Sequence, residues 1–260
     1  RLILFKTPIL TRWKRYNTKN NMNRFDIIQH AEGDGESTGL LTNIKENSSQ
    51  ESNIYKQLAA EAVGTLFLTA TIAMGADALG IGSMLAVMIF ALGHVSGAHL
   101  NPAVTLAVFI RGKIGLLRGG LYMIAQIAGA FLGALVPMLV LNDIDEKISY
   151  PKVHDDVSAG IALLVEAVFT LALATVVLNV ATTKAQKGNS FFGLAIGLTV
   201  TAAAKAAGRI SGGAFNPAVG FVLPLLREDY DDLWIYAVGP LAGGALAGGL
   251  FMLTARRDEF

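Results

Sequence analysis

Two stretches of the chain carry the same pattern and decide its architecture. Residues 96–104 read Ser-Gly-Ala-His-Leu-Asn-Pro-Ala-Val, and residues 211–219 read Ser-Gly-Gly-Ala-Phe-Asn-Pro-Ala-Val. Asn is a favoured N-cap, and Pro suits the first helical position because its missing N–H would have no partner there anyway. Each stretch therefore predicts a loop of small residues followed by the start of a short helix. The residues of the two motifs are Asn101, Pro102, Ala103, Asn216, Pro217 and Ala218.

Apolar segments long enough to cross a bilayer surround the two motifs. The short helices that follow the motifs, about 101–110 and 216–226, are too short to span and predict a membrane-deep pair. Non-helical backbone at that depth is tolerated only where protein buries it or where it lines a watery cavity, so the pair indicates a pore. The predicted spans are roughly 54–75, 79–95, 120–141, 159–180, 191–207 and 233–254.

The composition is that of an integral membrane protein. Of the 260 residues, 53% are hydrophobic and only 16% are charged, against about 25% charged in a soluble domain. The net charge of +1 gives no sign of a nucleic-acid partner. The chain has no cysteine and few histidines, and it shows no unexplained nucleophile and base. We therefore expect no metal, no cofactor and no enzymatic activity.

The two halves of the chain repeat each other. Residues 60–68 (Ala-Glu-Ala-Val-Gly-Thr-Leu-Phe-Leu) match residues 165–173 (Val-Glu-Ala-Val-Phe-Thr-Leu-Ala-Leu). Three spans in each half is an odd number, so the second half must be inverted relative to the first. Inverted repeats place the substrate path at the repeat interface, near the bilayer midplane.

Loop charges predict which face each end occupies. Basic residues follow the first short helix and lie between the fourth and fifth spans, whereas the opposite loops are acidic. The positive-inside rule then places both termini on the cytoplasmic side of a multi-pass protein, with plasma membrane, vacuole and organelle left open. Residues 1–53 read as a flexible basic and polar tail, either a targeting segment or a docking arm, and 255–260 as a short C-terminal tail.

With these features the chain resembles the aquaporin (major intrinsic protein) family. The resemblance lies in the two Asn-Pro-Ala motifs, the paired Glu-Ala-Val-x-Thr segments, residues 94–105 and the segment Trp-Ile-Tyr-Ala-Val-Gly-Pro at 234–240. It implies an all-α channel domain at 54–254 with repeats at about 54–141 and 159–254. It also implies six transmembrane helices and two half-helices in a right-handed bundle, assembled as a homotetramer with one pore per subunit.

The resemblance implies roles for the motif loops. The half-helices would meet N-terminus to N-terminus, with the Asn101 and Asn216 amides donating to passing water and so interrupting proton transfer. Extended backbone before each motif would supply a ladder of carbonyl acceptors, and Glu61, Glu166 and His94 would brace these loops. The ladder residues are Gly97, Ala98, His99, Gly212, Gly213 and Ala214.

The family's spacing places the pore constriction at Ile81, Ala204, Gly213 and Val219. Water-selective members usually carry an Arg where this chain has Val219, and several plant vacuolar members carry Val. A ring without hydrogen-bonding groups discriminates poorly between similar solutes. We therefore expect a permissive pore for water and neutral solutes such as glycerol, urea, ammonia or hydrogen peroxide. Alternatively, Lys205 reaches the constriction and supplies the missing cation.

Two other functions remain open. A secondary transporter would also have inverted repeats and broken helices, and Glu61 and Glu166 would be its candidate ion ligands. A non-conducting membrane scaffold would use the basic N-terminal tail as its docking arm. Saturable, gradient-coupled flux favours the transporter, and absence of flux favours the scaffold.

Overall fold

A computed structural model describes residues 35–140 and 148–259. The chain divides into two compact units, Arg1–Ile54 and Tyr55–Phe260. Residues 1–34 of the predicted basic and polar tail and the acidic loop residues Asp143, Asp145 and Glu146 lie outside the described residues.

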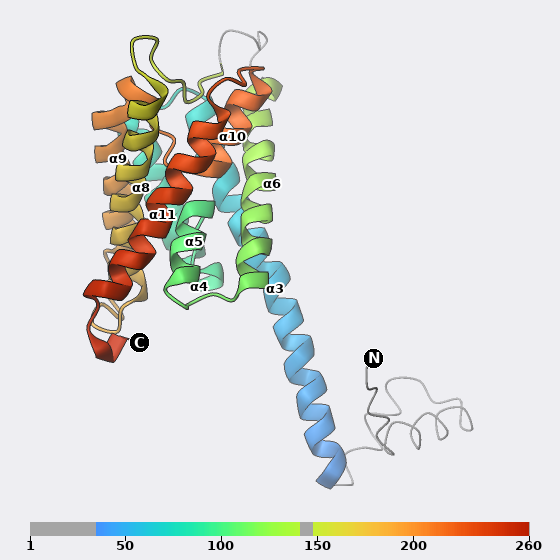
Figure 1. Ribbon diagram of the computed structural model, residues 1–260. Coiled ribbons are helices and arrows are strands. Elements are labelled where there is room, and N and C mark those ends of the chain that lie inside the picture. The colour runs from blue at the N-terminus through green and yellow to red at the C-terminus, as the bar shows by residue number, and fades with distance from the viewer. Residues whose placement is uncertain (1–34, 141–147, 260) are drawn as a thin grey trace, which may run out of the picture. The chain divides into compact units, whose positions relative to one another are not determined.

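The described residues form helices and connecting loops, without strands (Figure 1). The short helices α5 and α10 begin one residue after Asn101 and Asn216, as the motifs predict. The helices are α3 (Gly35–Ala73), α4 (Ala78–Ser96), α5 (Pro102–Ile110), α6 (Leu116–Val140), α8 (Ala159–Thr182), α9 (Phe192–Ser211), α10 (Pro217–Leu226) and α11 (Leu233–Thr254), followed by the 3₁₀ turn η2 (Arg257–Glu259).

The predicted spans agree with these helices to within a few residues, except at the start of the first. Helix α3 begins at Gly35, far upstream of the predicted start at Ile54, so part of the stretch expected as a flexible tail is helical. No proline interrupts the chain from Gly35 to Ala73, so a helix started there meets no break. The sequence prediction gave too much weight to the polar composition of this stretch.

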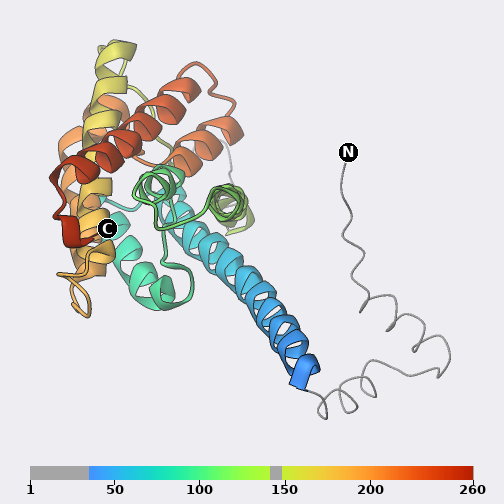
Figure 2. The same ribbon diagram turned by 60° about the horizontal axis from the view of Figure 1, so that its bottom comes forward.

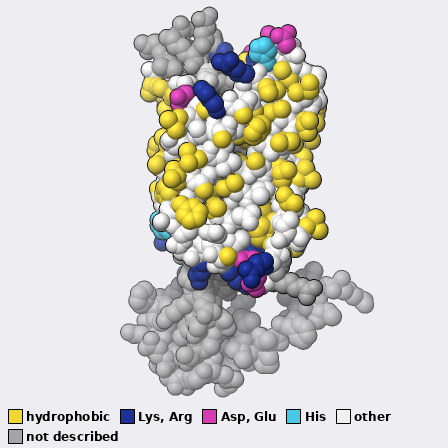
Figure 3. Space-filling view, turned by 90° about the vertical axis from the view of Figure 1, so that its left-hand side faces the viewer, with side chains coloured by type: hydrophobic (Ala, Val, Ile, Leu, Met, Phe, Trp, Pro, Cys, Tyr) yellow, Lys and Arg dark blue, Asp and Glu magenta, His cyan; other side chains and the backbone are white. Residues whose placement is uncertain are grey.

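Apolar side chains cover the outside of the second unit. Within the described part of the chain, four helices are long and apolar enough to cross a membrane, namely α4, α6, α8 and α11. Helix α9 is as long as α4 but carries Lys205 and Arg209. Figure 3 shows hydrophobic side chains spread over the middle of one face, with charged side chains gathered at its two ends. This distribution suits a lipid environment, in which only the ends meet water.

Glycines let the helices cross at close range. A Cβ built on Gly129 of α6 would lie 2.1 Å from the Ala62 carbonyl oxygen of α3, and one on Gly243 of α11 would lie 2.3 Å from the Ala167 carbonyl oxygen of α8. In Figure 2, α11 runs across α8. Small residues at such crossings maximise packing where no hydrophobic force drives helices together. The two crossings are equivalent in the repeats, so the same contact builds both halves.

We predict that Gly129→Ala destabilises the bundle. The new methyl group would overlap the Ala62 carbonyl, and overpacking of this kind costs about 1–3 kcal/mol. The thermal unfolding midpoint of the purified protein in detergent should fall by several degrees. Gly120→Ala in the same helix is the matched control, because a Cβ there meets nothing within 4 Å. Equal midpoints for the two variants would contradict the packing argument.

Candidate functional site

Asn101 and Asn216 cap the two short helices in the same way. Both have extended backbone, with φ of −160° and −149°. The Oδ1 of Asn101 accepts from the N–H of Ala103 at 2.8 Å, and the Oδ1 of Asn216 accepts from the N–H of Ala218 at 3.0 Å. Each side chain thus satisfies a backbone donor that the first helical turn leaves without a partner. The motifs are N-caps followed by proline at the first helical position, as predicted.

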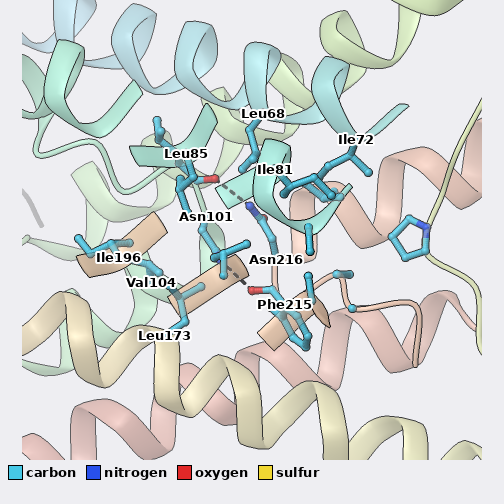
Figure 4. Close-up of a pocket in the computed structure, with 18 of the residues that line it drawn as sticks. Leu68, Ile72, Ile81, Leu85, Asn101, Val104, Leu173, Ile196, Phe215 and Asn216 are labelled. Carbon is cyan, nitrogen blue, oxygen red and sulfur yellow. Dashed lines mark hydrogen bonds between the residues drawn. The ribbon is translucent and has the colours of Figure 1, made fainter. Parts of the chain in front are cut away.

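The two caps also bind each other's loops. The Nδ2 of Asn101 donates to the Phe215 carbonyl at 2.8 Å, and the Nδ2 of Asn216 donates to the Leu100 carbonyl at 2.9 Å (Figure 4). Each amide nitrogen carries two hydrogens, and this contact uses one of them. The remaining hydrogen of each amide is a donor for a molecule in the cavity that both residues line.

The loop before each motif has a strained backbone. Ala98, Leu100 and Phe215 have φ of 46°, 51° and 48°, in the left-handed region that L-residues rarely adopt, and Gly213 has φ of 68°. Such conformations persist only where the surroundings determine them strongly. The buried glutamates Glu61 of α3 and Glu166 of α8 hold the two loops in these conformations.

Glu61 holds the first loop. Its Oε1 accepts from the Ser96 hydroxyl at 2.6 Å and the His99 N–H at 3.0 Å, and its Oε2 accepts from the Leu100 N–H at 2.7 Å. Its side chain is fully buried. A buried carboxylate is tolerable when donors surround it in this way, and the charge strengthens each of the hydrogen bonds.

Glu166 holds the second loop by the same arrangement. Its Oε1 accepts from the Ser211 hydroxyl at 2.7 Å and the Ala214 N–H at 3.0 Å, and its Oε2 accepts from the Phe215 N–H at 2.7 Å. The loop N–H groups of both repeats therefore point toward a glutamate. The bracing role predicted for the two glutamates agrees with these contacts.

The direction of the N–H groups fixes the direction of the carbonyls. In a trans peptide the carbonyl points away from the N–H of the next residue. Because the N–H groups of His99 and Ala214 face the glutamates, the carbonyls of Ala98 and Gly213 face the other way. The predicted ladder residues Ala98, His99, Gly212, Gly213 and Ala214 line the cavity; Gly97 does not.

Sequence reasoning missed several supports of these loops. The hydroxyl of Tyr122 donates to the Ser96 carbonyl at 2.9 Å, and that of Tyr236 donates to the Ser211 carbonyl at 2.7 Å. Gln126 donates to Glu61 Oε2 at 2.8 Å and to the Thr105 hydroxyl at 2.9 Å. The signal was present, because Tyr122 and Tyr236 lie in α6 and α11, which occupy equivalent places in the repeats.

The bracing role predicted for His94 is wrong. His94 is exposed in the last turn of α4, and it makes no hydrogen bond or ion pair with the part of the chain that the structure describes. The reason is helical phase: Val87, Ala91 and His94 share an exposed face of α4, whereas Leu85 and Ile89 face the core. Ser96, in the same last turn, makes the contact to Glu61.

The predicted constriction residues lie around one cavity of about 230 Å³. Ile81 comes from α4, Ala204 from α9, Gly213 from the second loop and Val219 from α10, and all four line it together with both motif asparagines. None of these four side chains can donate or accept a hydrogen bond. Lys205 is exposed and does not line the cavity, so its side chain is not placed to supply the missing cation.

The segment around Tyr150 contributes to the wall of the cavity. Ser149 and Tyr150 line the cavity, and the segment is anchored at the Ala73 carbonyl by the Ser149 N–H and at the Ile210 carbonyl by the His154 N–H. The hydroxyl of Tyr150 donates to Asp229 Oδ2 at 3.1 Å. Burial raises the pKa of Tyr150, and the hydrogen bond to Asp229 raises it further. The phenol therefore stays neutral at physiological pH.

Comparison with known proteins agrees with this geometry. Residues 48–251 match the model of the family described as Major intrinsic protein. The chain belongs to this family. This major intrinsic protein is 35% identical over 212 residues to the lens fiber major intrinsic protein of Lithobates pipiens, which covers 75% of the chain and 80% of the relative. It is an integral, multi-pass membrane protein.

Other relatives cover less of their own length. The chain is 34% identical over 174 residues to aquaporin-4 of Homo sapiens, covering 66% of the chain and 54% of the relative, so it spans about half of that protein. It is 39% identical over 159 residues to the probable aquaporin TIP2-2 of Arabidopsis thaliana (61% of the chain, 63% of the relative). The solved aquaglyceroporin of Plasmodium falciparum shares the fold, with a TM-score of 0.69, 23% identity and coverage of 79% of this chain and 98% of that one.

We predict that Glu166→Gln disrupts the second loop. The glutamine amide can accept at only one atom, so at least one of the three hydrogen bonds from Ser211, Ala214 and Phe215 is lost. A hydrogen bond to a charged group contributes about 1.5–3 kcal/mol. The unfolding midpoint in detergent should fall markedly. Glu228→Gln, at an exposed position, should leave it unchanged; a similar fall in both variants would refute the bracing role.

Proposed function

We propose that this protein is a passive channel for water and small neutral solutes. The observation that carries the proposal is the reciprocal pair of hydrogen bonds from the motif asparagines, set in a cavity lined by carbonyl acceptors on one side and apolar side chains on the other. A neutral solute gives up hydrogen bonds to water when it enters the cavity. The donors at the centre and the acceptors along the loops replace these hydrogen bonds. Relatives named aquaporin and aquaglyceroporin support the same function.

We further propose that the centre of the path excludes cations. Helices α5 and α10 begin at the paired asparagines, and each helix N-terminus carries about half a positive elementary charge. Both positive ends therefore act on the same region, where they repel cations and hydronium. A water that accepts from the free hydrogens of Asn101 and Asn216 has its oxygen occupied, which interrupts proton transfer along the file.

The constriction sets the range of solutes that we propose. Ile81, Ala204, Gly213 and Val219 offer no polar side chain that an alternative solute would leave unpaired, so they select by size alone. This predicts passage of water together with glycerol, urea, ammonia or hydrogen peroxide. Valine in place of the arginine of water-selective members supports the proposal that the chain is nearer the vacuolar-type members.

The alternatives have weaker support. A coupled transporter would need carboxylates available to an ion, but Glu61 and Glu166 are each engaged by hydroxyl and backbone N–H donors of their own repeat. Among the described residues, no group of three or more His, Asp or Glu is placed to hold a metal ion. The other alternative is a non-conducting scaffold, and a flux measurement distinguishes it from a channel.

The assembly and sidedness also belong to this proposal. The family implies a homotetramer, with each subunit holding its own pore. The exposed Lys113, Lys184 and Lys187 lie in loops that the positive-inside rule assigns to the cytoplasmic side. The segment at Tyr150, between α6 and α8, then lies on the opposite side of the membrane.

We predict that Val219→Arg converts a permissive pore into a water-selective one. The arginine would extend into the cavity from the first turn of α10, adding bulk and a positive charge. Stopped-flow light scattering on proteoliposomes should show urea and glycerol entry falling at least about tenfold, equivalent to about 1.4 kcal/mol on the barrier, with water flux retained.

Lys205→Ala is the control, since Lys205 is exposed and lies outside the cavity lining. It should leave both water and solute fluxes unchanged. Fast water flux without solute entry in the unmodified protein would refute the permissive constriction. Absence of any flux above that of empty liposomes would favour the scaffold.

A further inference from the structure

Arg111 is a buried cation at the end of α5 opposite to Asn101. Its residue is 3% exposed and forms the C-cap of the helix. The Nε donates to the Thr182 hydroxyl at 2.9 Å, and Nη2 donates to the Thr182 carbonyl at 3.2 Å. The guanidinium also lies 4.2 Å from the centre of the Phe251 ring. A buried charge needs a counter-charge and a full set of hydrogen bonds to be tolerated.

Glu259 supplies that counter-charge from the other end of the chain. It is 5% exposed, and its Oε2 lies 3.8 Å from Arg111 Nη2, which also donates to the Glu259 carbonyl at 3.0 Å. The same carboxylate accepts from the loop between α8 and α9: Oε2 from the Lys184 N–H at 2.6 Å and Oε1 from the Ala185 N–H at 3.2 Å. One side chain thus contacts two segments that are distant from it and from each other in sequence.

We propose that Arg111 and the N–H groups of Lys184 and Ala185 form a carboxylate-binding site, which the chain's own Glu259 fills. Two neighbouring backbone donors, one for each oxygen, and a guanidinium at the side match the geometry and charge of a carboxylate. Through this site the segment after α11 holds the α8–α9 loop against the end of α5. None of these residues lines the cavity, so the proposal does not rest on the proposed conduction.

Two further observations support this assignment. The Lys184 ammonium donates to the Asp258 carbonyl, so the loop grips the turn through both its backbone and its side chain. The Lys184 N–H also holds the pKa of Glu259 below its ordinary value, which keeps the carboxylate charged at neutral pH. By contrast, Asp258 pairs at 3.5 Å with Arg256 in solvent, with both side chains more than two-thirds exposed. Exposed pairs of this kind contribute little.

This contrast gives a matched pair of variants in the full chain. Glu259→Gln keeps the shape of the side chain but removes its charge and replaces one acceptor oxygen by a donor. Asp258→Asn makes the same chemical change one residue earlier, in a side chain that faces solvent. Hydrogen exchange of the Lys184 and Ala185 amides, followed by mass spectrometry on the protein in detergent, measures the occupancy of the site directly.

We expect exchange at these two amides to be at least about tenfold faster in Glu259→Gln, corresponding to about 1.4 kcal/mol of lost protection, and unchanged in Asp258→Asn. Tryptic cleavage between Lys184 and Ala185 should accelerate in Glu259→Gln alone. Equal exchange in both variants and the unmodified protein would overturn the proposal. Water flux measured on the same variants tests the channel separately, because neither residue lines the cavity.

Discussion

The centre of this protein depends on two asparagine side chains that each make two structural hydrogen bonds. Each caps its own half-helix with its oxygen and fastens the opposite loop with its nitrogen. This arrangement requires the residues before each motif, Leu100 and Phe215, to turn their carbonyls toward the other repeat, which explains their left-handed backbone. The strain is sustained by Glu61 and Glu166, whose oxygens collect the N–H groups on the far side of each loop.

The same pattern of hydrogen bonds explains why the site can offer both donors and acceptors to a solute. The loop N–H groups of His99 and Ala214 are used internally, so the loops present carbonyls, and the two asparagines contribute amide donors at the centre. The remaining wall comes from α3, α4, α8 and α9 and is apolar at Leu68, Leu85, Leu173 and Ile196. A path of this kind has one polar side and one apolar side, which limits the number of partners a solute can hold at once.

Much of this could be predicted from the sequence, because the signals were local or repeated. The N-cap chemistry of Asn-Pro-Ala predicted the half-helix starts, and the family resemblance implied the bracing role of the repeated glutamates. The roles of Gln126, Arg111 and Glu259 could not be predicted, because each depends on which segments meet in space and no local pattern reports that. The bracing role predicted for His94 was wrong for a related reason. Its place beside the motif suggested a contact, but the phase of α4 turns its side chain outward.

The reciprocal contacts between the repeats also constrain how the protein is made. The two hydrogen bonds join residues 114 and 116 positions apart, and each loop lacks a partner for its exposed carbonyl until the other repeat is present. During synthesis the Asn101 amide of the first half-helix therefore has no partner in the second loop until nearly the whole chain has entered the membrane. Contacts at such separations are slow to form. The paired contacts at the centre thus cannot form before Asn216 has been synthesised, and a chain that stops short of it does not contain them.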